Sequence, residues 1–139
     1  MTETTNMQLT GFYEHVYQVG NLRTMDHARR WTNGVLETLG TVLDRRSKRA
    51  VSKNLPDELA TSLNGVFWLL HFRDPHYSSE EFCQRVTKRS GNSDAEYARL
   101  LIRAVFGGMR LYIGPELDQR VADSLSPEMS SMWLEARPN

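Results

Sequence analysis

The sequence predicts an all-α protein, a single helical-bundle domain made of two tandem, pseudo-symmetric helical repeats. Apolar residues recur every three or four positions over long stretches, and no stretch alternates apolar and polar residues as a strand would. The sequence also resembles itself when it is shifted so that Leu55 falls on Leu125. With 139 residues, of which 40% are hydrophobic and 24% charged, the chain is long enough to bury one core.

The internal similarity keeps this offset without a gap from the pair Phe12 and Phe82 to the pair Leu63 and Trp133. The identical pairs at this spacing are Phe12/Phe82, Val16/Val86, Ala28/Ala98, Arg29/Arg99, Val35/Val105, Val51/Val121, Leu55/Leu125 and Glu58/Glu128. Other pairs, such as Trp31 with Leu101, keep an apolar residue in both halves. We interpret this pattern as a duplication within one domain, because the period is long and occurs only twice.

In the first half, helices are expected at residues 9–19, 25–43, 46–54 and 57–63. The apolar stripe of the longest one consists of Ala28, Trp31, Val35, Leu39, Val42 and Leu43. Thr24 can cap its start. Pro56 lacks an amide hydrogen, so it ends one helix and permits another to begin in a new direction. Leu55, just before this turn, is expected to point into the core.

In the second half, helices are expected at residues 79–89, 94–113, 116–124 and 127–135. The long stripe here consists of Ala98, Leu101, Ile102, Val105, Met109, Tyr112 and Ile113. Ser78 and Ser93 each precede a glutamate by three residues, a spacing compatible with a capping box. Pro127 marks the equivalent turn between two helices in the second half. Glycines 107 and 108 predict that another backbone packs closely there, either within the chain or in a dimer.

The domain is expected to span residues 9–135, between a flexible N-terminus at 1–8 and a tail at 136–139. Repeat one covers about 9–63, an apolar connector covers 64–77, and repeat two covers about 78–135. The start "MTETTNMQ" lacks the basic and apolar segments of a signal peptide, and no stretch approaches the ~18 apolar residues that cross a bilayer. A cytoplasmic protein with no membrane partner is therefore expected.

The stretch "EEFCQRVTKRSG" (80–91), the apolar stripe from Ala98 to Ile113, and a closing leucine with a proline-containing turn carry a resemblance. Together they resemble one unit of the bacterial family catalogued as domain of unknown function 2267. The resemblance covers Leu9 to Trp133 and implies a small helical protein with two such units. It implies a bacterial origin but no reaction, because its motifs are packing motifs. The first half departs from the pattern at His15, where the second half has Arg85.

Residues that could carry chemistry are scattered. His71 and His76 are five positions apart, which turns them away from a shared helix face. Cys83 is the only cysteine and is expected to be a small buried side chain. Two acid–base pairs are spaced for surface ion pairs, Asp26 with Arg30 and Glu116 with Arg120. We therefore expect no metal, no cofactor and no enzyme activity.

Two stretches are candidate binding surfaces. "VFWLLHF" (66–72), in the connector, is too apolar to lie in water, so it is either packed between the halves or exposed to a partner. Its candidate partner-binding residues are Phe67, Trp68 and Phe72. "DRRSKRAVSK" is a basic run, whereas the equivalent second-half stretch "PELDQRVAD" carries acids. The candidate electrostatic patch in the basic run consists of Arg45, Arg46, Lys48 and Arg49.

These observations favour a small cytoplasmic protein–protein interaction module, an adaptor or a self-associating subunit, without catalytic activity. Its partner would be another protein or a second copy of the chain. In the second case, the acidic second half of one copy could contact the basic run of the other. One alternative is nucleic-acid binding through the basic helix 45–53, which lacks aromatic residues for base stacking. Another is a small ligand in the groove between the repeats.

Overall fold

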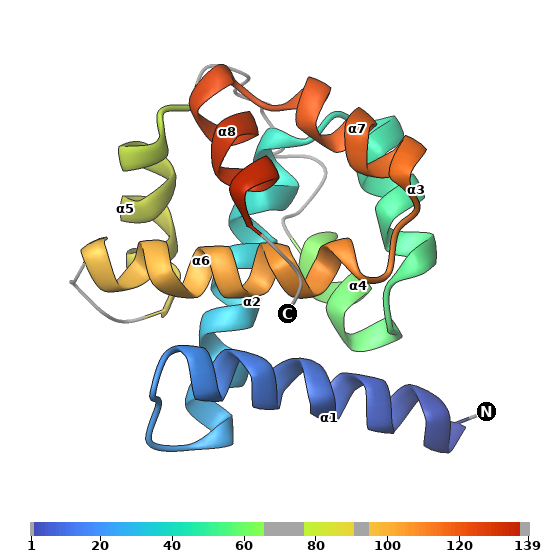
Figure 1. The fold of residues 1–139 in the computed structure, drawn as a ribbon, viewed down its shortest axis with the longest axis vertical. Helices are drawn as coiled ribbons and strands as arrows, with labels where there is room; N and C mark the ends of the chain where they lie inside the picture. The colour runs from blue at the N-terminus through green and yellow to red at the C-terminus, as the bar shows by residue number, and fades with distance from the viewer. Residues whose placement is uncertain (1, 66–76, 91–94, 137–139) are drawn as a thin grey trace.

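The computed structural model describes residues 2–65, 77–90 and 95–136, with side chains for residues 9–65, 77–90 and 96–136. Within these ranges the chain forms eight α-helices and no strand, which confirms the predicted all-α class (Figure 1). The helices are α1 (Thr2–Val19), α2 (Met25–Val42), α3 (Arg45–Asn54), α4 (Asp57–Leu63), α5 (Ser79–Ser90), α6 (Ala95–Arg110), α7 (Pro115–Ser124) and α8 (Pro127–Glu135).

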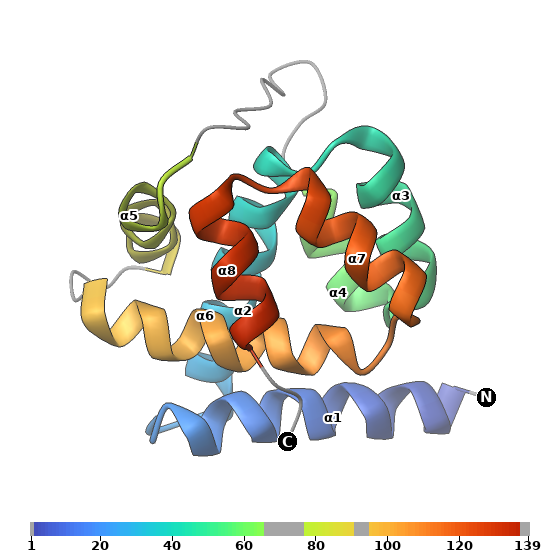
Figure 2. The same ribbon diagram turned by 45° about the horizontal axis from the view of Figure 1, so that its top comes forward.

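Three of the four described helices in each half begin at matching positions. The starts of α2 and α6, of α3 and α7, and of α4 and α8 are each separated by the same offset that relates Leu55 to Leu125. The packing partners also correspond, because α1 packs against α2 and α6 while α5 packs against α6 and α2. Figures 1 and 2 show α1 running beneath α6, and α3 lying beside α7. These features support the two-repeat interpretation, and the pseudo-symmetry of the repeats stays a prediction.

One hydrophobic core receives side chains from every helix. The predicted stripe of α2 is buried throughout, and that of α6 is buried except at Tyr112, which is half-buried. At the centre, the Phe106 ring lies 5.0 Å from the Trp133 ring and 5.9 Å from the Phe82 ring, measured between centroids. Because these rings come from α6, α8 and α5, burial of their apolar surface holds three helices of the second half together.

Side-chain caps explain the starts of α2 and α5. The Thr24 hydroxyl accepts the amide hydrogen of His27, and the Ser78 hydroxyl accepts that of Glu81, so both predicted caps are confirmed. The cap predicted at Ser93 lies outside the described residues. Leu55 and Leu125, which precede the two proline-containing turns, are buried as expected.

Two helix ends differ from the sequence expectation by more than one residue. Helix α1 begins at Thr2, whereas a flexible segment was expected up to residue 8. The first turns contain neither proline nor glycine, so nothing in the sequence interrupts the helix before Gly11. Helix α6 ends at Arg110 rather than at residue 113, because Leu111 and Tyr112 donate to carbonyls only three residues back. Pro115 then starts α7.

The close approach at Gly108 involves a side chain, whereas another backbone was expected. The ring of Phe12 lies against Gly108, and a Cβ atom built on Gly108 would be 2.7 Å from Phe12 Cε2. Gly108 therefore makes room for an aromatic side chain of α1 on the surface of α6, and the contact is within the chain.

Candidate functional site

The candidate site is built on α3, whose start is tied to α7. The Asp44 carboxylate accepts the amide hydrogen of Ser47 at 2.8 Å and its hydroxyl hydrogen at 3.1 Å. The Asp44 amide donates to the Ser124 hydroxyl at 3.3 Å. Ser47 and Val51 are buried, which turns one face of α3 toward the core. The basic residues of the helix are thereby left on its other faces.

We call Arg45, Arg46, Lys48, Arg49 and Lys53 the basic face of α3. Lys48 is half-buried and the other four are exposed. Among the described residues, no carboxylate lies within ion-pair distance of any of the five. Elsewhere in the described chain five arginines do form ion pairs with carboxylates: Arg29, Arg30, Arg89, Arg103 and Arg110. The basic face thus brings together the whole electrostatic patch predicted from the sequence, and no carboxylate of the described chain neutralises it.

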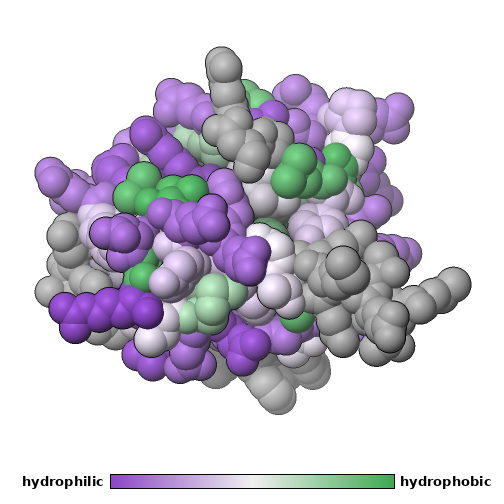
Figure 3. Space-filling view, turned by 60° about the horizontal axis from the view of Figure 1, so that its bottom comes forward, coloured by the Kyte–Doolittle hydropathy of each residue, from purple (hydrophilic) through white to green (hydrophobic). Residues whose placement is uncertain are grey.

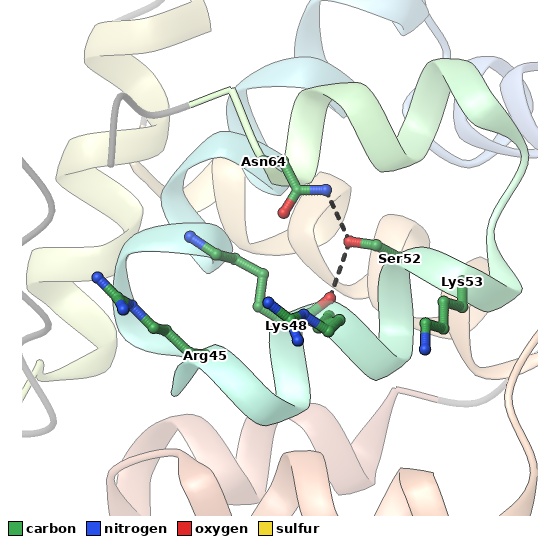
Figure 4. Close-up of a pocket in the computed structure, with 6 residues that line it drawn as sticks. Arg45, Lys48, Ser52, Lys53 and Asn64 are labelled. Carbon is green, nitrogen blue, oxygen red and sulfur yellow. Dashed lines mark hydrogen bonds between the residues drawn. The ribbon is translucent and has the colours of Figure 1, made fainter. Parts of the chain in front are cut away.

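A hollow of about 390 Å³ lies between α3 and the end of α4. We call it the lysine hollow; its lining residues are Arg45, Lys48, Arg49, Ser52, Lys53 and Asn64. Figure 4 shows Lys48 between Arg45 and Lys53 along α3, with Asn64 facing the helix from α4. The Asn64 amide donates to the Ser52 hydroxyl at 2.8 Å, and that hydroxyl donates to the Lys48 carbonyl at 2.8 Å. Hydrogen bonds thus hold both polar walls in place.

Lys48 is the most constrained cation of the hollow. Its ammonium group donates to the Gly40 carbonyl, near the end of α2, at 3.1 Å. Burial, and to a lesser degree the positive charge of Arg45, lower the pKa of Lys48 below its usual value. Both effects disfavour the charged form of the side chain, so an anion placed beside it would be stabilising.

A second hollow, of about 500 Å³, lies on the other side of the same helix. Its lining residues are Arg45, Arg46, Arg49, Ala50, Lys53 and Asn54, and we call it the outer hollow. Arg45, Arg49 and Lys53 line both hollows and form a ridge between them, since they recur every four residues. Lys48 lines only the lysine hollow, and Arg46 lines only the outer one.

Acidic side chains lie next to this surface, on the neighbouring helix α7. A third hollow of about 440 Å³ is lined by Asp44, Glu116, Gln119, Arg120, Asp123 and Ser124. The ion pair expected between Glu116 and Arg120 is not formed, so that prediction is wrong, whereas the pair of Asp26 and Arg30 is confirmed at 3.7 Å. The predicted charge contrast between the two halves is therefore found at adjacent helices.

The sequence interpretation missed two polar residues of the lysine hollow, Ser52 and Asn64. Neither is charged, and Asn64 reaches the hollow only because α4 folds back along α3. The sequence did contain one signal for the position of Asn64: it directly follows the last apolar residue of a helix, and asparagine is common at helix ends. The other candidate set, Phe67, Trp68 and Phe72, lies outside the described residues.

Exposed apolar side chains do not form a competing site in the described part of the chain. The large ones are Val19, Met25, Leu100, Leu111 and Leu134. On the face shown in Figure 3, apolar atoms occur in separate small patches among polar ones. Such scattered residues are normal for a folded domain and mark no interface by themselves.

Two groups that could carry chemistry, Tyr13 and Cys83, are buried in the structure. The Tyr13 hydroxyl donates to Glu58 Oε1 at 2.9 Å, and Arg29 Nε lies 3.2 Å from the same oxygen. Burial, followed by the hydrogen bond to Glu58, raises the pKa of Tyr13 well above its usual value, so the phenol stays protonated. Cys83 is buried as predicted, and burial raises the pKa of its thiol. No group of three or more metal-binding side chains is present among the described residues.

The fold and this surface define a class, that of small all-α domains with an exposed basic face. The chain belongs to the family described as "Uncharacterized conserved protein (DUF2267)", whose model matches residues 10–132. The resemblance found in the sequence is thereby confirmed. No curated protein matches the chain. None of the described helices is long and apolar enough to span a membrane.

Proposed function

We propose that this protein is a non-catalytic protein–protein interaction module of the bacterial cytoplasm, and that the basic face of α3 docks an acidic segment of its partner. The observation that carries the proposal is the contrast in pairing: five arginines elsewhere have carboxylate partners, and the five cations of α3 have none among the described residues. Carboxylates of a partner would supply the missing counter-charges, which favours fast and specific association.

An acidic protein segment fits this surface better than a nucleic acid does. Among the described residues, neither hollow on α3 is lined by an aromatic side chain on which a base could stack. Glu116 and Asp123 lie close by on α7 and would repel a long phosphodiester backbone. The formal net charge of the whole chain is +0, so attraction is confined to the basic face.

A second copy of the chain is the other candidate partner, because α3 and α7 lie side by side (Figure 2). Two copies related by a two-fold axis could place each basic face on the acidic α7 of the other. The role expected for Phe67 and Trp68 in such an interface stays a prediction.

Binding of a labelled peptide tests the proposal. We expect a nine-residue peptide of glutamate and glycine to bind, to bind more weakly as salt increases, and to be distinguished from its glutamine analogue. The double variant Arg45→Gln, Arg49→Gln should weaken binding about tenfold or more, measured by fluorescence anisotropy. The double variant Arg30→Gln, Arg103→Gln removes the same charge from exposed ion pairs elsewhere and should bind normally.

Two results would count against an acidic protein partner. Equal binding of the glutamate and glutamine peptides would contradict it directly. Tighter binding of RNA or DNA than of the peptide at low salt would favour the nucleic-acid alternative. A salt-sensitive dimer, found by molar mass in solution and lost in the α3 double variant, would instead identify a second copy of the chain as the acidic partner.

A further inference from the structure

The lysine hollow lies at the corner where α2, α3 and α4 meet. The equivalent corner of the second half, where α6, α7 and α8 meet, is closed by hydrogen bonds within the chain. Arg110 donates to the two carboxylate oxygens of Asp118 at 2.9 and 2.8 Å, and the indole nitrogen of Trp133 donates to Asp118 at 2.7 Å. Arg110 also donates to three carbonyls at the end of α8. Its side chain and that of Asp118 are only 18% and 21% exposed, so positive and negative charge are balanced inside this corner.

In the first half the same positions carry different residues. At the offset that relates the two halves, Lys48 corresponds to Asp118, and Gly40 corresponds to Arg110. The sign of the charge is reversed at three positions of this register: Arg46 against Glu116, Lys48 against Asp118, and Lys53 against Asp123. The first-half corner therefore has cations where the second half supplies its own carboxylate. It also has an open hollow of about 390 Å³.

We infer that the lysine hollow is a site for a phosphorylated side chain of the acidic partner. The inference rests on the proposed function, because it names the chemical group that the basic face recognises. Four cationic side chains line this one hollow, together with the polar groups of Ser52 and Asn64. A single carboxylate would neutralise one of the four charges.

A phosphate monoester matches the hollow more closely. It carries a charge of about −1.5 to −2 at neutral pH and has three acceptor oxygens. Arginine binds such a group through two parallel hydrogen bonds, and lysine binds it as a point charge. Arg45 and Arg49 on the ridge could supply the first kind of contact, and Lys48 the second.

The surroundings of the hollow favour a group carried on a peptide over a free anion. The ridge of Arg45, Arg49 and Lys53 continues into the outer hollow, where Arg46 adds a further cation. A ligand that places its phosphate beside Lys48 can therefore use this second basic area for the acidic residues that flank the phosphate. A free phosphate ion would leave the outer hollow unused.

Two peptides that differ at one position test the inference. The first is a nine-residue peptide of glutamate and glycine with a central phosphoserine; the second has glutamate in that place. We expect the intact protein to bind the phosphopeptide about tenfold more tightly at ~0.1 M salt, measured by fluorescence anisotropy. This preference should depend on Lys48 and not on Arg46.

The matched variants are Lys48→Gln and Arg46→Gln, which remove one charge each from the same helix but line different hollows. We expect Lys48→Gln to abolish the preference for phosphate and Arg46→Gln to weaken both peptides equally. Because Lys48 bonds to Gly40, helix content is checked by circular dichroism. Asn64→Ala, at an exposed lining residue, serves as a second variant that should also reduce the preference.

Each other outcome is decisive. If both peptides bind equally, the phosphate inference is wrong while the proposed function stands. If inorganic phosphate alone binds as tightly as the phosphopeptide, or if Arg46→Gln removes the preference as fully as Lys48→Gln does, the inference is also wrong. If neither peptide binds, the proposed function fails, and the inference fails with it.

Discussion

At the residue scale, two helical glycines meet opposite surroundings. Gly11 in α1 is exposed, and a Cβ built on it has no neighbour within 4 Å. Gly40 in α2 is buried, and its Cβ would lie 2.1 Å from the backbone oxygen of Leu63. Of these two positions, only residue 40 requires a glycine for packing, because the backbone carbonyl of Leu63 cannot move aside as the end of a flexible side chain can.

We therefore expect alanine to have opposite effects at these two positions. Gly11→Ala should raise the free energy of unfolding by about 0.5–1 kcal/mol, since alanine loses less backbone entropy in a helix. Gly40→Ala should lower it by about 1–3 kcal/mol, because the added methyl group overpacks the contact of α2 with Leu63. Urea denaturation followed by circular dichroism measures both. A stabilising effect of Gly40→Ala would contradict the close approach of Leu63.

Single residues also show what the sequence could and could not predict. The burial of Leu55, Leu125 and Cys83 was predictable, because each depends on the polarity of the residue and its place in a helical pattern. The place of Asn64 in the lysine hollow was not, because it depends on the direction in which α4 returns along α3. The basic residues of the site were identified from their run in the sequence, whereas their lack of carboxylate partners within the described chain is a property of the fold.

At the element scale, one ion pair joins three helices. Arg110 at the end of α6 holds Asp118 of α7, and Asp118 in turn accepts the indole hydrogen of Trp133 from α8. The sequence predicted a different pairing on α7, between residues one helical turn apart. Local spacing predicts contacts along one helix, but Arg110 and Asp118 meet because the chain turns sharply at Gly114 and Pro115.

Loss of this carboxylate should loosen the second-half corner. We expect Asp118→Asn to lower the free energy of unfolding by about 2 kcal/mol, because three charge-assisted hydrogen bonds, two from Arg110 and one from Trp133, are weakened or lost in a partly buried place. Asp123→Asn removes the same charge from the same helix at an exposed residue and should change stability by less than about 0.5 kcal/mol. Equal effects of the two variants in urea denaturation would contradict the structural role of Asp118.

At the scale of the whole molecule, each half of the chain is packed on the other. Helix α1 lies against α6, where the ring of Phe12 covers Gly108. Helix α5 lies against α2, where Ser90 approaches Gly34 so closely that a Cβ there would be 2.4 Å from its hydroxyl oxygen. The sequence predicted two units joined in tandem, and similarity between the units could not reveal which helix packs against which.

Because helices of each half pack against helices of the other, we expect that neither half folds alone. A fragment of residues 1–76 lacks the α6 surface against which Phe12 packs, and a fragment of residues 77–139 lacks the Trp31 ring of α2 that packs against Tyr97. Each would expose apolar area that is buried in the intact chain, at about 25 cal/mol for every Å². We expect each fragment to show low helicity and no cooperative thermal transition, and an equimolar mixture to regain helicity by circular dichroism. A cooperative transition in either fragment alone would instead mean that a single repeat is an independent domain and that the contacts between halves are secondary.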